Sequence, residues 1–169
     1  MRSDIITPTE STFESAQKDL FKIIQKLISN ENLKKLLYYP VKDALEQPEL
    51  TTEETVGLLH RNIRVIPKLP VDEEIQAYII VSFDAFTPNE KNPQFRDNLI
   101  TFDVICNMDC WSMNDYQLRP YLIMGEIDGM MNKAKLNGIG KVDYISANQL
   151  LLSEDLAGFS VMYRVINDV

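Results

Sequence analysis

The sequence predicts an α+β fold with a mostly antiparallel sheet of about four to five strands, an N-terminal amphipathic helix and a second helix packed on one face. Two long segments in the middle of the chain alternate apolar and polar residues, which is the period of a strand. A segment near the N-terminus places apolar residues at steps of three and four, which is the period of a helix. The elements follow in the order helix, marginal strand, two long strands, helix and two strands, which is typical of the α+β class.

The composition predicts one domain without an affinity for nucleic acid. At 169 residues, of which 45% are hydrophobic, the chain can bury a core. We assign residues 11–169 to a single α+β domain and residues 1–10 to a flexible N-terminal arm. The 25 acidic and 17 basic residues are dispersed and leave a net charge of -8. Because phosphate contacts need clustered Lys and Arg, this balance argues against wrapping nucleic acid, although DNA could still pass nearby.

The N-terminal segment predicts one long helix and one short helix. Residues 11–14 (STFE) match a capping box, so the first helix begins there. The short helix carries the leucines of residues 33–37 and must end near Tyr39, because the residue before Pro40 avoids the helical conformation. The apolar face of the first helix should pack on the sheet and consists of Phe13, Ala16, Leu20, Ile23, Ile24, Leu27 and Ile28.

The next segment predicts only short elements. Residues 41–50 have little periodicity and predict a connecting loop with room for one helical turn. Thr51 can cap a turn of helix over residues 51–59, since the glutamates that follow it favour a helix N-terminus through the backbone dipole. Residues 63–68 predict an extended segment, and the prolines at 67 and 70 confine it to the margin of the sheet.

The centre of the chain predicts a long-looped antiparallel hairpin. Its first strand, residues 77–84, carries apolar side chains at every second position on one face, and residues 98–107 repeat the pattern. Thr101 and Asp103 should mark the wetter face of the second strand. Residues 86–96 (FTPNEKNPQFR) contain prolines and asparagines that suit a turn and oppose continued pairing.

The C-terminal part predicts a helix and two strands. Pro120 suits the first turn of the helix, and the pair at residues 137–138 (NG) suits its end. Gly125 and Gly129 share a face of this helix, where each costs about 1 kcal/mol relative to alanine. Either close packing of the helix on the sheet or a subunit contact would explain them. The strands cover residues 141–152 and 159–166 and are joined by a turn (SEDLAG). The buried stripe of the helix should contain Ile123, Ile127, Met130 or Met131, and Ala134.

The cysteines predict a reducing compartment and no metal site. Cys106 and Cys110 are four residues apart, and His60, the only histidine, is far from them in sequence, so the three do not form a zinc set. We interpret both cysteines as structural free thiols in a reducing cytoplasm. The sequence has no apolar run of membrane-spanning length and no signal peptide. It therefore predicts a soluble intracellular protein without a membrane contact.

No pattern of catalytic residues stands out, so we do not expect an enzyme. His60 has no serine or cysteine near it in sequence. Most paired carboxylates fall at turns or helix starts, whereas Asp103 and Asp128 lie within regular elements without a sign that they meet. The glycine motifs GEIDG and GIG lack the spacing and the lysine of a phosphate-binding loop. The sequence predicts no cofactor.

Large side chains in the loops are the candidate site residues. Aromatic residues and methionine are enriched at protein interfaces, because they bury much area at modest entropic cost. The alternative is that they close the ends of the core. The predicted protein-contact residues are Phe86 and Phe95 in the hairpin loop, and Trp111, Met113 and Tyr116 in the connection before the helix.

The order of these elements resembles the tail terminator and tail-completion proteins of tailed bacteriophages. The resemblance covers roughly residues 11–167 and rests on the hairpin (AYIIVSFDAFTPNEKNPQFRDNLITFDVICN), the helix (RPYLIMGEIDGMMNKAKLNG) and the closing strand (GFSVMYRVIND). It implies a ring, commonly of six copies, that caps the tail tube and joins the tail to the head. It also implies contacts with the tail tube protein and with a head-tail connector or head-closure protein. DNA would pass through the lumen without specific binding, and the protein would reside in the virion neck after assembly in the host cytoplasm.

Two departures from the simplest family pattern leave the neck position open. The segment of residues 33–70 before the hairpin is long, and the N-terminal arm is unassigned. One alternative is therefore another head-tail connector, a head-closure protein or a minor tail protein. A small intracellular binding domain, which would be a monomer or dimer with a pocket, is the second alternative.

Overall fold

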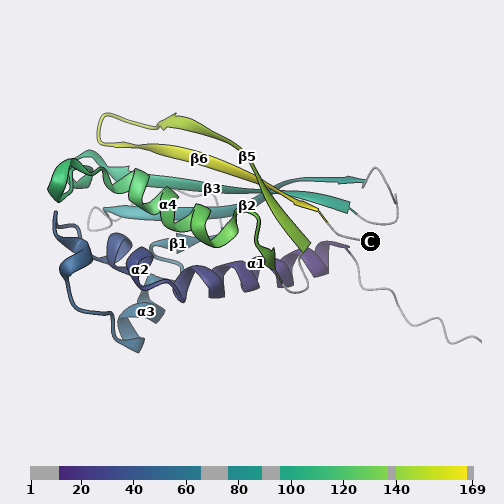
Figure 1. Cartoon of the computed structure of the whole chain (residues 1–169), viewed down its shortest axis with the longest axis horizontal. Helices are drawn as coiled ribbons and strands as arrows, with labels where there is room; N and C mark the ends of the chain where they lie inside the picture. Colours follow the sequence, from purple (N-terminus) through teal and green to yellow (C-terminus); the bar gives the residue numbers. More distant parts are fainter. Residues whose placement is uncertain (1–11, 66–75, 89–95, 137–139, 167–169) are drawn as a thin grey trace, which may run out of the picture.

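A six-stranded sheet carries its helices on one side. The computed structural model describes residues 12–65, 76–88, 96–136 and 140–166. The strand order is β1-β2-β3-β6-β5-β4, and all neighbours are antiparallel except β1 and β2. Figure 1 shows α1, α2 and α4 on the same side of the sheet. The predicted α+β class and the packed N-terminal and second helices are confirmed. The strands are β1 (Ile63–Arg64), β2 (Ala77–Pro88), β3 (Arg96–Asn107), β4 (Lys135–Leu136), β5 (Gly140–Leu151) and β6 (Leu156–Ile166).

The helices lie in the segments that the sequence predicts to be helical, although α4 is shorter than predicted. They are α1 (Thr12–Ile28), α2 (Glu31–Tyr38), α3 (Thr52–Leu58) and α4 (Arg119–Met131). In α1, Ile23 and Leu27 are fully buried, whereas Phe13, which the sequence placed on the apolar face, is exposed. The predicted cap at Ser11 and the arm of residues 1–10 lie outside the described residues.

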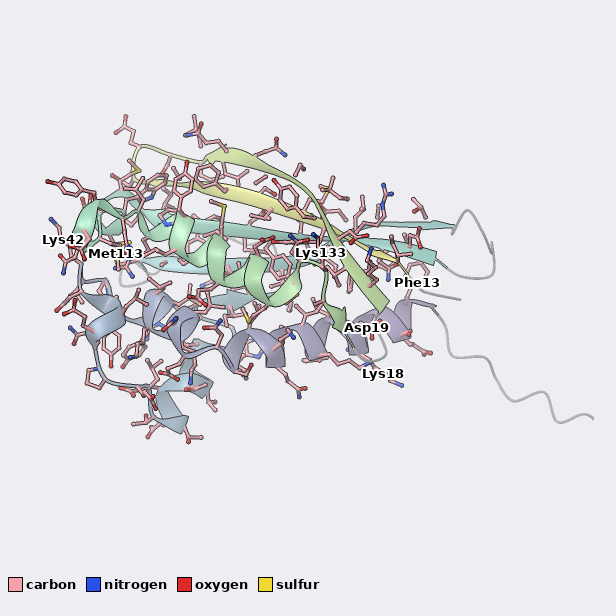
Figure 2. The ribbon with its side chains drawn as sticks, viewed as in Figure 1. Phe13, Lys18, Asp19, Lys42, Met113 and Lys133 are labelled. Carbon is pink, nitrogen blue, oxygen red and sulfur yellow. The ribbon has the colours of Figure 1, made fainter. Side chains whose placement is uncertain are left out.

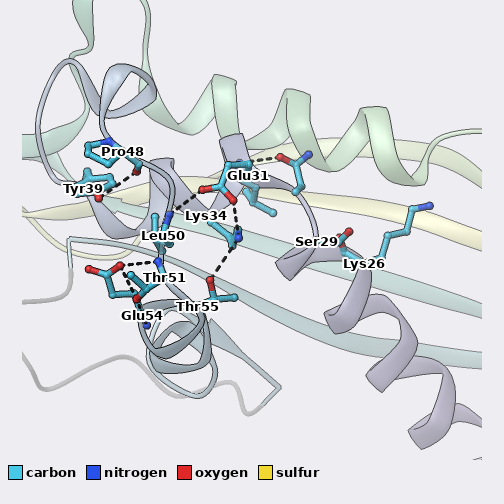
Figure 3. Close-up of polar contacts among 12 residues, drawn as sticks. Lys26, Ser29, Glu31, Lys34, Tyr39, Pro48, Leu50, Thr51, Glu54 and Thr55 are labelled. Carbon is cyan, nitrogen blue, oxygen red and sulfur yellow. Dashed lines mark hydrogen bonds and ion pairs between the residues drawn. The ribbon is translucent and has the colours of Figure 1, made fainter.

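Side-chain caps determine where α2 and α3 begin. Thr51 and Glu54 form the predicted cap as a full capping box, in which the hydroxyl accepts from one amide and the carboxylate from the other. Glu31 of α2 accepts from the amide of Leu50 at 3.0 Å and from Lys34 at 2.6 Å, as Figure 3 shows. The start of α3 is therefore held against α2. The predicted helical turn within residues 41–50 is η1 (Ala44–Glu46).

The predicted start of the hairpin loop at Phe86 is wrong. The strand β2 continues to Pro88 and β3 begins at Arg96, so only residues 89–95, which the structure does not describe, separate them. A bulge between Phe83 and Ala85 inserts one residue into β2. Because one extra residue moves each following side chain to the other face, Phe86 lies on the helix side, 5.7 Å from the ring of Phe83.

The two faces of the sheet differ in composition. On the helix side, the predicted apolar faces of β2 and β3 are buried, with Ile79, Val81, Phe102 and Val104 fully so. The opposite face bears no helix among the described residues, and we call it the helix-free face. It carries a small buried cluster and the predicted polar residues. The cluster consists of Tyr78, Ile80 and Ile105, with Leu150 and Leu156 packed against it.

The prediction that Thr101 is exposed to water on the helix-free face is wrong. The sequence places it on the wetter face, yet it is buried. Its hydroxyl donates to the carboxylate of Asp84, so a protein acceptor takes the place of water. Asp103, the other residue predicted for this face, is half-buried.

The helix α4 ends earlier than predicted and does not use its glycines for packing. It stops at Met131, because Lys133 adopts a left-handed conformation and its amide donates to the carbonyl of Val142 at 2.7 Å, which leads the chain to the sheet. Residues 137–138, the predicted end, lie outside the described residues. Gly125 and Gly129 are exposed, and a Cβ added to either would meet no atom within 4 Å. Close packing of these glycines on the sheet is therefore ruled out.

The close approach of β6 to β3 requires Gly158. This residue pairs with Ile105 of β3, and a Cβ built on it would lie 1.8 Å from the backbone oxygen of Val104. Since that oxygen belongs to a central strand, it cannot move without disturbing the ladder on both sides. The strand β6 begins at Leu156, before the predicted start at Phe159, so this glycine is a strand residue and not a turn residue.

We expect Gly158→Ala to destabilise the fold by about 3 kcal/mol, because the new methyl group must displace backbone atoms. Urea denaturation followed by circular dichroism would measure the change in unfolding free energy. Gly57→Ala is the matched control, since a Cβ there meets nothing within 4 Å. Equal stability of the two variants would contradict the close approach of β6 and β3.

Tyr78 has a buried hydroxyl that finds no hydrogen-bond partner among the described residues. Burial raises the pKa of Tyr78 to about 12. The folded chain therefore holds this proton more tightly than the unfolded chain. This difference in pKa contributes to the unfolding free energy. The contribution is fully present below about pH 10 and is lost as the pH rises toward 12.

We expect Tyr78→Phe to raise the unfolding free energy by about 1 kcal/mol at neutral pH, because the variant removes a buried polar group that has no partner. Between pH 10 and 12 the variant should lose less stability than the parent. Urea titrations at several pH values would measure both effects. Destabilisation at neutral pH together with an unchanged alkaline slope would mean that the hydroxyl is satisfied.

Candidate protein-contact surfaces

The connection between β3 and α4 forms a closed loop at one end of the sheet. The side chain of Asn107 accepts from the amide of Asp109 at 2.9 Å and starts the short helix η2 (Met108–Cys110). A bridge between Ser112 and Leu118 closes residues 112–118. Within this loop, η3 (Asn114–Tyr116) donates from the amide of Asn114 to the carbonyl of Lys42 at 3.1 Å. The loop is therefore tied to the segment that follows α2.

Tyr116 lies at the tip of this loop. Asp115 and Tyr116 have φ of 56° and 59°, which non-glycine residues rarely adopt. The side chain of Tyr116 is fully exposed. Left-handed residues persist where the surrounding structure determines them, and here the bridge and the bond to Lys42 do so. The loop thus presents an aromatic ring to solvent from a fixed backbone.

Trp111 belongs to a partly exposed aromatic cluster. Its indole nitrogen donates to the carbonyl of Cys106 at 3.2 Å, and its ring lies 6.4 Å from that of Phe159 on β6. Tyr121 of α4 lies 5.0 Å from the same phenylalanine and is 55% exposed. Leu118, in the same connection, is also exposed. We give the name loop-end surface to Trp111, Tyr116, Leu118 and Tyr121.

Met113, one of the predicted contact residues, is turned toward the core. Its side chain is buried and belongs to the main core. The sequence left open whether these large residues contact another protein or close the end of the core, and Met113 closes the end of the core. Figure 2 shows Met113 beside Lys42 at the end of the molecule opposite Phe13. The physical reason is the bond from the amide of Met113 to the carbonyl of Gln117 at 2.9 Å, which turns the chain back toward the core.

Phe86 lies at the other end of the sheet. Its ring packs 5.3 Å from that of Phe13 in a T-shaped arrangement, and Phe13 is 62% exposed. We call Phe13 and Phe86 the hairpin-end surface. Phe95 lies outside the described residues. The structure therefore separates the predicted contact residues into two surfaces at opposite ends of the sheet.

The side chain of Arg119 links the connection before α4 to the C-terminal end of α2. Its guanidinium is fully buried and donates to four backbone carbonyls, those of Cys110, Leu36, Tyr39 and Val41, at 2.6 to 2.8 Å. The carbonyls of Leu36 and Tyr39 belong to the C-terminal end of α2, where a cation is favourable. Burial lowers the pKa of Arg119. No periodicity marks Arg119 as buried, although an arginine just before Pro120, at the positive end of a helix dipole, is an available signal.

The two thiols lie beside this arginine. Cys106 and Cys110 are both free and buried, as expected for structural thiols. The hydrogen bond from Cys106 lowers the pKa of Cys110 and outweighs burial, and the charge of Arg119 acts in the same direction. The same bond, together with burial, raises the pKa of Cys106 well above its ordinary value. The pair therefore neighbours the guanidinium but has little access to solvent.

The residues weighed for catalysis do not meet. His60 is exposed in the turn after α3 with φ of 66°. Asp103 lies on the helix-free face, where burial raises its pKa despite a bond from Ser160. Asp128 accepts from the hydroxyl of Tyr163 at 3.0 Å on the helix side, so the sheet separates the two carboxylates. The described part of the chain contains no cluster of three or more His, Cys, Asp or Glu that could hold a metal ion.

Comparisons with known proteins identify a family. The family model described as YomW matches residues 30–165, which include β2, β3, α4 and β5 and all of β6 except its last residue. No curated protein and no solved structure matches the chain. No helix within the described ranges is long and apolar enough to cross a membrane.

We expect Arg119→Met to destabilise the protein by about 3 to 5 kcal/mol, because four backbone carbonyls, two of them in buried bonds, lose their donor. Arg119→Lys should lie between the parent and this variant, since an ammonium lacks the planar fork. Chemical denaturation would measure both. Lys141→Met, which removes an exposed ion pair with Asp143, should change stability by less than about 1 kcal/mol.

Proposed function

We propose a structural role in the bacteriophage neck for this chain, which belongs to the YomW family. In this role, copies of the chain form a ring that terminates the tail tube and joins the tail to the head. The family model itself matches most of the chain but states no activity. The proposal therefore depends on the resemblance in element order and on the arrangement of the exposed residues.

The separation of the two aromatic surfaces is the observation that carries this proposal. The loop-end surface and the hairpin-end surface lie at opposite ends of long strands, and each exposes at least one large ring. A terminator must contact the tail tube on one side and a connector or head-closure protein on the other. Two unlike surfaces at opposite ends meet that requirement, whereas a single surface would not.

The helix-free face supports the passage of DNA. Asp84, Asp97 and Asp103 point to this side, as their register in β2 and β3 requires. Its basic residues include Lys141, which is paired with Asp143 at 3.0 Å. If this face lines the lumen, its carboxylates would repel the phosphate groups of DNA and oppose their binding to Lys141 and to Arg164, which lies opposite Asp143 in the sheet. DNA could then move through the ring without specific contacts.

A small intracellular binding domain has less support. The hollow beside the α1–α2 turn is open and polar, and its walls include Lys26, Glu31 and Glu126. Glu126 already accepts from the side-chain amides of Asn30 and Asn32 at 2.8 and 3.1 Å. Ligand sites are usually enclosed and mostly apolar, so this hollow fits a structural joint between helices better than a pocket. A different neck position predicts the same ring and differs only in its partner.

The test is the mass of the purified protein in solution, followed by electron microscopy of any large species and by sedimentation with purified tail tubes. We expect a ring of about six copies in solution, or a ring that forms only on the tubes. Either result fits the closed symmetric assemblies that copies of one chain commonly form. A monomer at high concentration that also fails to bind tubes would exclude the terminator role.

Tyr116→Ala tests the loop-end surface in the same assay. We expect it to weaken binding to the tube or to the connector by about tenfold or more, as truncation of an aromatic anchor does at protein interfaces. Phe21→Ala is the matched control, because Phe21 is an exposed aromatic residue of α1 outside both surfaces. Equal loss in the two variants would mean that Tyr116 is not an anchor.

A further inference from the structure

The outer edge of β5 is open over residues 147–151. Figure 1 shows β5 along one margin of the sheet, where β4 pairs only with its first two residues. The segment after α4 adds bonds to Val142 and, through Asn132 at 3.4 Å, to the amide of Tyr144. Beyond these contacts, no strand in the described part of the chain neighbours β5 on this side.

This edge lacks the features that usually prevent pairing with another strand. Residues 144–152 (YISANQLLL) contain no charged residue and no proline, in a chain of which 25% is charged. Edge strands of soluble proteins commonly carry lysine, proline or a bulge that blocks a further strand. The bulge of β5 lies before the open stretch, between Tyr144 and Ser146. Residues 147–151 can therefore accept a further strand.

The register shows which backbone groups of this stretch face outward. Val142 and Tyr144 direct their amides away from β6, so the residues opposite them on β6 direct theirs toward β3. The ladder between β6 and β3 is regular, so every second residue of β6 does the same. The residues of β5 opposite these positions therefore have outward amides and carbonyls, and beyond the bulge they are Ala147, Gln149 and Leu151.

Exposed apolar side chains gather along this edge. Leu151 is 75% exposed, more than any other large aliphatic side chain in the described ranges. Tyr144, Ile145 and Leu152 are exposed as well, so four of the thirteen exposed large hydrophobic residues fall within residues 144–152. Apolar groups that are gathered in one place on a surface indicate a contact with another protein.

We propose that the β5 edges of two copies of this chain pair in antiparallel orientation and join the two sheets across a twofold axis at Gln149. In this register, Gln149 lies opposite the same residue of the second copy, and Ala147 lies opposite Leu151. Because all three residues have outward amides and carbonyls, each pair can exchange both of its N–H···O bonds. A large side chain also lies beside a small one at each end of the contact.

The distribution of charge favours a second copy as the partner of this edge. A net charge of -8 on each copy opposes association, so the surfaces that meet should be free of acidic residues. The proposed register brings residues 147–151 of both copies together, and none of them is charged. The overlap also ends short of Tyr144, where Asn132 flanks the strand, so the segment after α4 does not block it.

This dimer goes beyond the proposed function and does not depend on it. Its two copies run in opposite directions, whereas all copies in a cyclic ring point the same way. The dimer is therefore a separate form of the protein, which is populated away from the tail tube. Of the two results expected for the proposed function, it fits the ring that forms only on the tubes.

Gln149→Pro is the decisive variant. The amide of Gln149 points away from β6, so proline removes no bond within the subunit, and an edge strand tolerates proline where the amide faces solvent. Both bonds of the central pair are lost, so we expect the dimer to bind at least about tenfold more weakly in analytical ultracentrifugation. Gln149→Thr is the matched control, because it keeps the amide and suits a strand, and it should leave the dimer unchanged.

Gln149→Lys tests the same contact without a change to the backbone. It places two ammonium groups opposite each other, so it should also weaken the dimer, while an unchanged circular dichroism spectrum shows that the subunit is folded.

Amide hydrogen exchange of the wild type locates the contact. In the dimer we expect protection of the outward amides of Ala147, Gln149 and Leu151, of which the first and last should exchange fast in Gln149→Lys. A dimer with fast exchange at these amides, or one that persists in both Gln149→Pro and Gln149→Lys, would overturn this inference. Wild-type protein that is monomeric at millimolar concentration, or that forms only the ring, would also overturn it, and the proposed function would still depend on binding to tail tubes.

Discussion

The structure depends most on the burial of Arg119. A guanidinium removed from water needs several acceptors, and here the backbone of three separate segments supplies them. The carbonyls at the end of α2 have no partner within their own helix, and the loop carbonyls of Val41 and Cys110 have none in the sheet. One side chain therefore satisfies groups that would otherwise be exposed or unpaired. It also joins the helical layer to the connection from which Tyr116 protrudes.

A second constraint is the register of the sheet. The bulge in β2 places Phe86 on the helix side, beside Phe83 and Phe13, and so gives the hairpin end an apolar surface. Without the extra residue, the ring would lie on the helix-free face among carboxylates and hydroxyls. At the other end, Gly158 allows β6 to approach β3 closely. The two ends of the sheet therefore have different surfaces because of two local backbone features, whereas the middle is regular.

The elements that the sequence predicted well are those that local patterns determine. Steps of three and four identify α1 and α2, alternation identifies β2, β3 and β6, and the Thr51 cap identifies α3. The failures concern features that depend on distant residues. A bulge leaves no mark in a pattern of alternation, and the end of α4 depends on bonds to Val142. Arg119 has the composition of a surface residue, and its burial follows only from carbonyls about 80 positions away in the sequence. Of the residues predicted for protein contact, Trp111 is partly exposed and Tyr116 fully exposed, whereas the sequence could not show that Met113 turns inward.

The arrangement of surfaces also bears on the kind of symmetry that the chain can adopt. A twofold dimer uses the same patch on both subunits, so it could cover one end of the sheet or one edge and would leave the others exposed. The described exposed features are of several kinds: an aromatic loop end, an aromatic hairpin end and an uncharged edge on β5. The two aromatic surfaces lie at opposite ends of the long strands. A cyclic assembly whose copies meet through other surfaces would keep both aromatic ends available for different partners.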